Sequence, residues 1–77
     1  MVISLDKLNL KHSGIVQNIS CNKTITRRLN DLGLLIGTTI TPIFSSPFGD
    51  PTAFEFRGNI IAIRKEDSSK ILVKTEI

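Results

Sequence analysis

The chain has 77 residues, of which 40% are hydrophobic and 22% charged, so we expect one domain over residues 1–77. This composition excludes a disordered polar segment, which could not bury enough apolar surface to offset its chain entropy. No apolar run approaches the ~20 residues of a membrane span, and the opening residues are too few for a signal-peptide core. We therefore expect a cytoplasmic protein, whose net charge of +3 favours acidic proteins, membrane surfaces or nucleic acid as neighbours.

The only soft metal ligands are His12 and Cys21, and a single cysteine cannot form an internal disulfide. A lone thiol fits a reducing compartment and excludes a cysteine-rich zinc site. Because the two residues lie near opposite ends of one predicted strand, we expect no metal site and no cofactor. The sequence also lacks a nucleophile beside a base and a phosphate-cradling glycine loop, so we expect no enzyme activity.

The first segments predict short elements. Residues 4–8 resemble a single helical turn that Ser4 can cap. A polar turn that ends in glycine follows. The β-branched segment 15–19 then predicts a strand with Ile15 and Ile19 on one face.

One helix of about nine residues follows, and Asn22 or Thr24 can cap its first turn. Its inner stripe has apolar residues at the i, i+4 and i+7 positions: Ile25, Leu29 and Leu32. Gly33 stands where a helix needs a left-handed residue to stop, and Leu34 can fold back on the last turn in a Schellman-type contact.

From residue 38 onward the sequence favours β-strands. Residues 38–44 are rich in β-branched side chains, but Pro42 cannot donate to a ladder of hydrogen bonds. We therefore expect Pro42 at an edge or a bulge. Residues 45–51 contain two prolines, a glycine and an aspartate, which indicates a shaped loop.

A hairpin follows this loop. Residues 52–57 alternate in polarity, which places Phe54 and Phe56 on the inner face. The pair Gly58-Asn59 suits a two-residue turn with positive φ, and residues 60–64 can pair back.

The chain closes with a polar tight turn over residues 65–70 and a last strand that starts at 71–73. The elements together predict a mainly β fold, a small and strongly bent barrel of about five strands with one short α-helix. Ten residues are expected to fill its core: Ile25, Leu29, Leu32, Ile40, Phe54, Phe56, Ile61, Ile63, Ile71 and Val73.

Two ordered motifs then point to a family. They are Arg27-Arg28-Leu29-Asn30-Asp31-Leu32-Gly33-Leu34 with Gly37, and Ser46-Pro47-Phe48-Gly49-Asp50-Pro51 followed by Gly58 and Ile61-Ala62-Ile63-Arg64. The chain resembles, over about residues 5–77, the FeoA family, the small cytosolic component of bacterial ferrous iron transport. The resemblance implies an SH3-like barrel and a role as partner of the membrane ferrous iron transporter FeoB. It implies attachment to the membrane only through that partner, and it supplies no catalytic residue.

A partner-binding face is predicted where the end of the helix would meet the proline-rich loop. Its candidate residues are Arg27, Arg28, Leu34, Leu35, Pro47, Phe48, Gly49 and Asp50. Phe48 supplies an apolar tip on a stiff loop, and the two arginines can steer an acidic partner surface. At least one of the three apolar residues at 34–36 should be exposed, because one helix stripe cannot bury them all.

Two alternatives stay open, a small-barrel nucleic-acid-binding module and the SH3-like module of a metal-dependent regulator. Against nucleic acid, the chain has no Trp or Tyr, and the spacing of Phe54 and Phe56 places both in the core. We therefore expect no nucleic acid as partner. Weak self-association is also left open.

Overall fold

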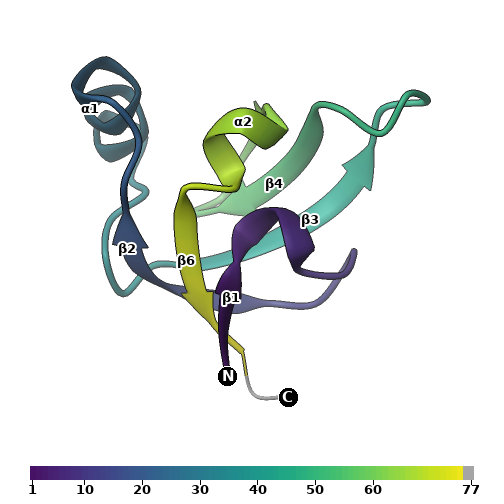
Figure 1. The fold of residues 1–77 in the computed structure, drawn as a ribbon, viewed down its shortest axis with the longest axis horizontal. Helices are drawn as coiled ribbons and strands as arrows, with labels where there is room; N and C mark the ends of the chain where they lie inside the picture. Colours follow the sequence, from purple (N-terminus) through teal and green to yellow (C-terminus); the bar gives the residue numbers. More distant parts are fainter. Residues whose placement is uncertain (76–77) are drawn as a thin grey trace.

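An antiparallel sheet of six strands forms the body of the protein, and the computed structural model describes residues 1–75 (Figure 1). The strands are β1 (Val2–Ser4), β2 (Gly14–Ile19), β3 (Thr39–Ser45), β4 (Thr52–Phe56), β5 (Asn59–Ile63) and β6 (Ile71–Lys74). The helices are the 3-10 helix η1 (Leu5–Lys7), α1 (Lys23–Asp31) and α2 (Lys65–Ser68). The strands lie in the order β1-β6-β2-β3-β4-β5.

The mainly β fold with one short helix of nine residues is confirmed. The structure also contains two small elements that the sequence did not predict. The extra strand, β1, has only three residues and pairs with β6. The extra helix, α2, is a single turn over part of the predicted tight turn, where Ser68 donates its N–H to the carbonyl of Arg64 at 2.9 Å. None of the helices in the described part of the chain has the length and hydrophobicity that a membrane crossing requires.

Strand β3 runs through both halves of the sheet. It pairs with β2 up to Ile40 and with β4 from Thr41 onward. The register with β4 shifts between Pro42 and Phe44, so Pro42 lies at a bulge, as the sequence predicted. Its carbonyl accepts the N–H of Lys11 at 2.7 Å, which ties the segment before β2 to the middle of β3.

Helix α1 begins at one of its two predicted caps. The side-chain oxygen of Asn22 accepts the N–H of Ile25 at 2.9 Å, while Thr24 lies inside the first turn. On the inner stripe, Leu29 is buried, and Ile25 and Leu32 are half-buried against the core. The helix is therefore held by one face, as expected for so short a segment.

The end of α1 is a complete Schellman motif. Gly33, with φ of 102°, donates its N–H to the carbonyl of Asn30 at 2.9 Å, and Leu34 donates to the carbonyl of Leu29 at 2.8 Å. Leu34 folds back as predicted and is completely buried. The helix stop therefore places an apolar side chain in the core.

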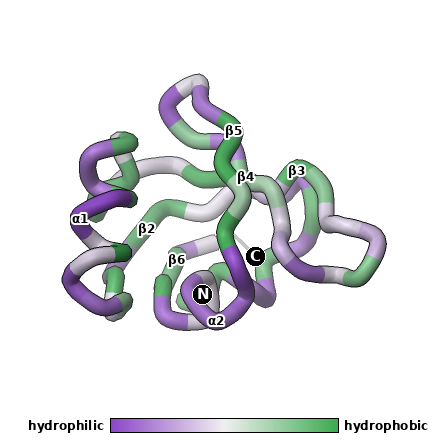
Figure 2. The backbone as a smooth tube through the Cα atoms, turned by 90° about the horizontal axis from the view of Figure 1, so that it is seen from above, coloured by the Kyte–Doolittle hydropathy of each residue, from purple (hydrophilic) through white to green (hydrophobic). Residues whose placement is uncertain are grey.

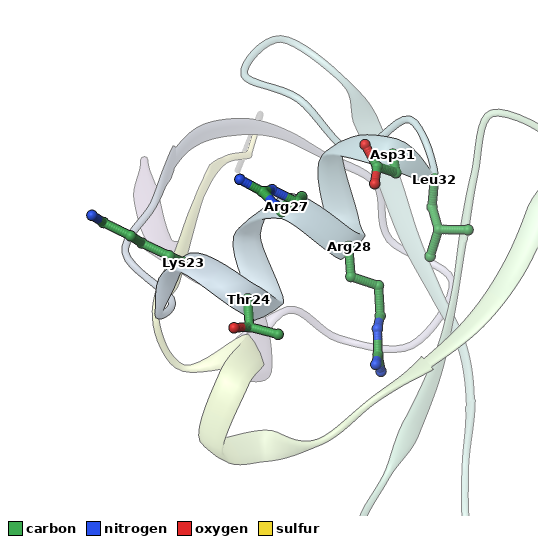
Figure 3. A pocket seen from close by; sticks show the side chains of 6 residues that line it. All are labelled: Lys23, Thr24, Arg27, Arg28, Asp31 and Leu32. Atoms are coloured by element: carbon green, nitrogen blue, oxygen red, sulfur yellow. The ribbon is translucent and has the colours of Figure 1, made fainter.

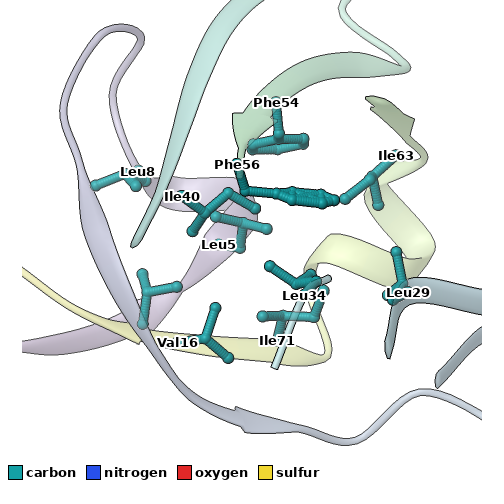
Figure 4. Packing of buried hydrophobic residues seen from close by; sticks show 11 residues of the cluster. Leu5, Leu8, Val16, Leu29, Leu34, Ile40, Phe54, Phe56, Ile63 and Ile71 are labelled. Carbon is teal, nitrogen blue, oxygen red and sulfur yellow. The ribbon is translucent and has the colours of Figure 1, made fainter. Parts of the chain in front are cut away.

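The core lies between the sheet and the three helices (Figure 4). Seven of the ten predicted core residues are buried: Leu29, Ile40, Phe54, Phe56, Ile63, Ile71 and Val73. The other three, Ile25, Leu32 and Ile61, are half-buried against them. The prediction missed four buried members of this cluster: Leu5, Leu8, Val16 and Leu34.

The prediction that Ile15 and Ile19 share one face of β2 was wrong. Ile15 is 43% exposed, and its neighbour Val16 is completely buried. The pairing of β2 with β6 shifts between Val16 and Asn18, and Ile19 beyond this bulge is half-buried. An extra residue in a strand reverses the alternation of side chains between the two faces of the sheet. Ile15 before the bulge and Ile19 after it therefore do not lie on the same face.

The turn between β4 and β5 lies one residue earlier than predicted. Arg57 and Gly58 form it, with φ of 52° and 77°, and Asn59 pairs with Phe56 as the first residue of β5. A two-residue turn of this hand needs positive φ at both positions. Arg57 therefore adopts a backbone conformation that favours glycine or asparagine, because the strand pairing requires it.

Candidate functional site

The exposed side of α1 carries the basic residues of the predicted partner face. Arg27 and Arg28 are both exposed, and no ion pair joins either of them to another residue within 1–75. Figure 3 shows their side chains leaving the helix in different directions beside an open depression. Lining residues of the depression are Lys23, Thr24, Arg27, Arg28, Asp31 and Leu32. The lining carries three positive charges, on Lys23, Arg27 and Arg28, and one negative charge, on Asp31. This excess of positive charge favours an acidic partner.

The segment after α1 presents apolar side chains to solvent, but Leu34 is not one of them. Leu34 is completely buried and leaves the set of candidate contact residues. Leu35 is 45% exposed and Ile36 is 71% exposed. The buried hydroxyl of Thr38 holds this segment, because it accepts the N–H of Leu35 at 3.0 Å and donates to the carbonyl of Gly33 at 3.3 Å.

The proline-rich loop between β3 and β4 is closed by its own hydrogen bonds. Gly49 donates its N–H to the carbonyl of Ser46 at 2.9 Å, and the Ser46 hydroxyl donates to the carbonyl of Asp50 at 2.7 Å. Pro47 and Phe48 form the exposed middle of this turn. Phe48 is 95% exposed, so the loop presents a bare aromatic ring on a constrained backbone.

Asp50 joins the loop to α2. Its Oδ1 accepts the N–H of Lys65, the first residue of α2, at 2.8 Å. The residue at the N-cap position of α2, Arg64, makes no side-chain capping bond. The carboxylate of Asp50, which is distant in the sequence, caps the helix instead. Only the tertiary structure shows this partner, because Lys65 lies far from Asp50 in the sequence.

The structure does not bring the helix end and the loop into one face, which corrects the prediction of a single contact surface. Figures 1 and 2 show α1 and the β3–β4 loop at opposite ends of the molecule. The reason is β3, which starts near the helix exit and ends at the loop. Seven extended residues span roughly 20 Å, so the two candidate regions are separate surfaces.

A further arginine lies at the end of α1, although no sequence motif predicts this position. Arg57, in the turn between β4 and β5, lies with its Cγ 3.3 Å from where a Cβ on Gly33 would stand. Asn59 of the same hairpin donates its side-chain N–H to the carbonyl of Leu32 at 3.5 Å. Nothing local in the sequence indicates these contacts, because they depend on how the hairpin packs on α1.

The candidate metal ligands do not form a cluster. Residues 1–75 contain no group of three or more His, Cys, Asp or Glu side chains placed to hold a metal ion. Cys21 is half-buried, and its Sγ donates to the carbonyl of Asp67 at 3.4 Å. Burial raises the pKa of the Cys21 thiol above its ordinary value, and the charge of Asp67 raises it further, while Lys70 acts in the opposite direction.

The aromatic residues of β4 are not a base-stacking platform. Phe54 and Phe56 are each 1% exposed and lie inside the core, as predicted. A ring that stacks on a nucleobase must offer one open face. The two exposed aromatic residues, Phe44 and Phe48, lie instead at the end of β3 and in the loop after it.

Comparison with protein families matches residues 3–75 to the FeoA domain. No curated protein matches the chain. Among solved structures, the FeoA protein of Chlorobium tepidum superposes with a TM-score of 0.92 at 25% identity, over 97% of this chain and 71% of that one.

Two further structures cover nearly the whole of both chains. A crystal structure described as an iron uptake regulatory protein (FeoA) has 31% identity and a TM-score of 0.80, over 96% of each chain. The FeoA of Stenotrophomonas maltophilia, complexed with zinc and described as a prokaryotic SH3 domain protein, has 26% identity and a TM-score of 0.78, over 96% of this chain and 89% of that one. The predicted SH3-like fold is therefore confirmed.

Proposed function

The chain belongs to the FeoA family of non-enzymatic proteins associated with ferrous iron transport, and on this premise we propose that it binds the membrane transporter FeoB from the cytoplasmic side. The protein acts by contact and carries out no chemical step of its own. Its contribution is to bind the transporter and bias or assemble a working state of it.

The observation that carries this proposal is the surface at the end of α1, which we call the helix-end face: Arg27, Arg28, Leu35 and Ile36. Its arginines have no ion-pair partner within residues 1–75, and its two apolar side chains are exposed. Exposed apolar side chains and unpaired cations on consecutive segments are typical of a protein-binding surface, where the charges guide encounter and the apolar groups supply buried area.

The loop residues Pro47, Phe48, Gly49 and Asp50 stay in the proposal as a second and separate contact surface of the same protein. The constrained turn around Phe48 loses little conformational entropy when its tip is buried. Because the loop lies at the other end of the molecule, it does not touch the same part of a partner as the helix-end face.

Co-purification with FeoB tests the helix-end face, in cells that depend on this ferrous uptake route. We expect Leu35→Ser combined with Arg28→Glu to abolish co-purification and uptake while the variant keeps its thermal unfolding midpoint. The matched control is Ile15→Ser, because Ile15 is 43% exposed against 45% for Leu35 and lies on β2. Unchanged co-purification by the double variant would refute this face, and equal loss in the control would show that any exposed apolar change has the same effect.

A further inference from the structure

Three exposed apolar side chains belong to segments at the end of the molecule opposite α1. Phe44 pairs with Ala53, so its ring lies on the face of the sheet opposite to the depression that Leu10 lines. Leu10 is 47% exposed, Phe44 is 57% exposed and Phe48 is 95% exposed. Phe44 and Phe48 flank the start of the β3–β4 loop, and the bond from Lys11 to the Pro42 carbonyl holds the segment of Leu10 against β3. We call these three side chains the apolar tip.

The fold does not need aromatic rings at this place. The closed turn of the loop depends on the Ser46 carbonyl, the Ser46 hydroxyl and the Gly49 N–H, and on no contact of the Phe48 ring. A polar residue at position 48 would satisfy the same turn geometry. A nearly fully exposed phenyl ring on a constrained loop is therefore available for a contact outside the chain.

Lysines lie on the Leu10 side of the apolar tip. Lys7 and Lys65 line, together with Leu10 and Gly49, one depression at the base of the loop, and Lys11 follows Leu10 in the chain. All three lysines are exposed, and none forms an ion pair within residues 1–75.

Two carboxylates near these lysines, those of Asp6 and Asp50, each have one oxygen turned toward the protein. One oxygen of Asp50 accepts the backbone N–H of Lys65 at 2.8 Å. One oxygen of Asp6 is buried and has no hydrogen-bond partner. The three lysines are therefore exposed without an ion pair, while one oxygen of each carboxylate is engaged or covered by the protein.

We propose that the apolar tip inserts into the interface of an anionic lipid bilayer. Phe48 enters the boundary between headgroups and acyl chains, Phe44 and Leu10 follow at its rim, and the lysines contact the lipid phosphates. A projecting aromatic tip with lysines beside it is complementary to a negatively charged interface, which accepts rings at headgroup depth and lysines at the phosphates.

This inference gives the loop surface around Phe48 a membrane as its partner, and it does not require that the helix-end face binds FeoB. The two surfaces lie at opposite ends of the molecule, so the helix-end face stays accessible while the tip touches a membrane. We expect the lipid contact alone to be weak and reversible, with an association constant of ~10⁴ M⁻¹, the value for a single acyl chain. Such a contact would serve to concentrate and orient the protein at the membrane.

The test uses a single tryptophan as probe. The chain contains no Trp and no Tyr, so the indole of Phe48→Trp is the only strong emitter in the protein. The matched control is Ile60→Trp, because Ile60 is 58% exposed at the other end of the β4–β5 hairpin. Both variants are titrated with vesicles of phosphatidylcholine alone and with vesicles that contain equal parts of phosphatidylglycerol, in the absence of any transporter.

We expect the Phe48→Trp emission to shift to the blue with the anionic vesicles and to be quenched by brominated acyl chains. The Ile60→Trp emission should not change. Adding Lys11→Glu and Lys65→Glu should weaken vesicle binding by at least about tenfold. The Phe48→Trp circular dichroism spectrum and unfolding midpoint verify that the fold is intact.

Absence of a shift with anionic vesicles would overturn the proposal, as would an equal shift in the control. A shift seen only with detergent-solubilised FeoB would overturn it in favour of a protein pocket for Phe48. Because the vesicles contain no transporter, this outcome is independent of whether the helix-end face binds FeoB.

Discussion

Gly33 at the end of α1 lies directly against Arg57 in the turn between β4 and β5. A Cβ added at Gly33 would stand 3.3 Å from Cγ and 3.6 Å from Cβ of Arg57. Both residues have positive φ, 102° and 52°, so two tight turns from distant parts of the chain pack on each other. This contact fixes where the helix-end face lies relative to the sheet.

Replacing Gly33 with alanine should destabilise the protein more than the same change at Gly37. Both glycines have φ near 100°, 102° and 93°, so each substitution pays about 1–2 kcal/mol for the left-handed backbone. Only at Gly33 must a neighbour also move, because nothing lies within 4 Å of a Cβ at Gly37. Thermal unfolding measures the difference, at roughly 4–8 °C per kcal/mol for a domain of this size. Equal unfolding midpoints for the two variants would show that the Arg57 side chain moves aside without a cost in stability.

Phe56→Ala should lower the free energy of unfolding by about 3–5 kcal/mol, because it removes a ring from the closed core. Phe56 is 1% exposed, and Phe44 is 57% exposed, so Phe44→Ala is the matched control. The control should stay within about 0.5 kcal/mol of the parent protein. Urea denaturation measures both values, and similar losses in the two variants would contradict the assigned faces of β3 and β4.

Asp50→Ala should destabilise the protein by about 1 kcal/mol, the usual cost of removing a helix cap. The Asp50 carboxylate accepts the first N–H of α2, which would otherwise lack a protein partner. Asp50→Asn keeps an accepting oxygen and should recover most of the loss. Urea denaturation of the two variants decides the point, and identical losses would indicate that the charge of Asp50 matters rather than its hydrogen bond.

The thiol of Cys21 should react with iodoacetamide more slowly in the folded protein than in urea at the same mildly alkaline pH. Burial and the charge of Asp67 raise its pKa, so fewer molecules carry the reactive thiolate. The folded state then holds its proton more tightly than the unfolded state. The stability that the protonated Cys21 thiol contributes is complete below the pKa of this thiol in the unfolded state. That contribution declines as pH rises above this value.

Cys21→Ser should therefore remove part of the loss of stability at alkaline pH. The measurement is the unfolding midpoint of both proteins as a function of pH. Equal alkylation rates in the folded and unfolded states would contradict the raised pKa.

Isolated protein should show no saturable ferrous iron binding in the micromolar range. Residues 1–75 bring together no three ligating side chains, and a stable site for this metal uses several His and carboxylate ligands. Anaerobic calorimetry measures the heat of titration. A one-to-one isotherm that disappears in His12→Ala would overturn the expectation.

Features that depend on neighbouring residues could be predicted from the sequence. The stop of α1 at Gly33, the capping by Asn22 and the bulge at Pro42 each follow from a single backbone requirement of one residue. The exposed ring of Phe48 belongs to the same class, because a proline-flanked turn must project its central residue. These signals were sufficient for the family resemblance and for most of the core.

The tertiary structure decided what depends on contacts between distant segments. The bulge against β6 determines that Val16 rather than Ile15 faces the core, and α2 supplies the partner of Asp50. The length of β3 separates the helix-end face from the apolar tip, which motif spacing alone had placed together. Local sequence sets the turns and caps because their hydrogen bonds close within a few residues, whereas the facing and separation of surfaces depend on how whole strands pair.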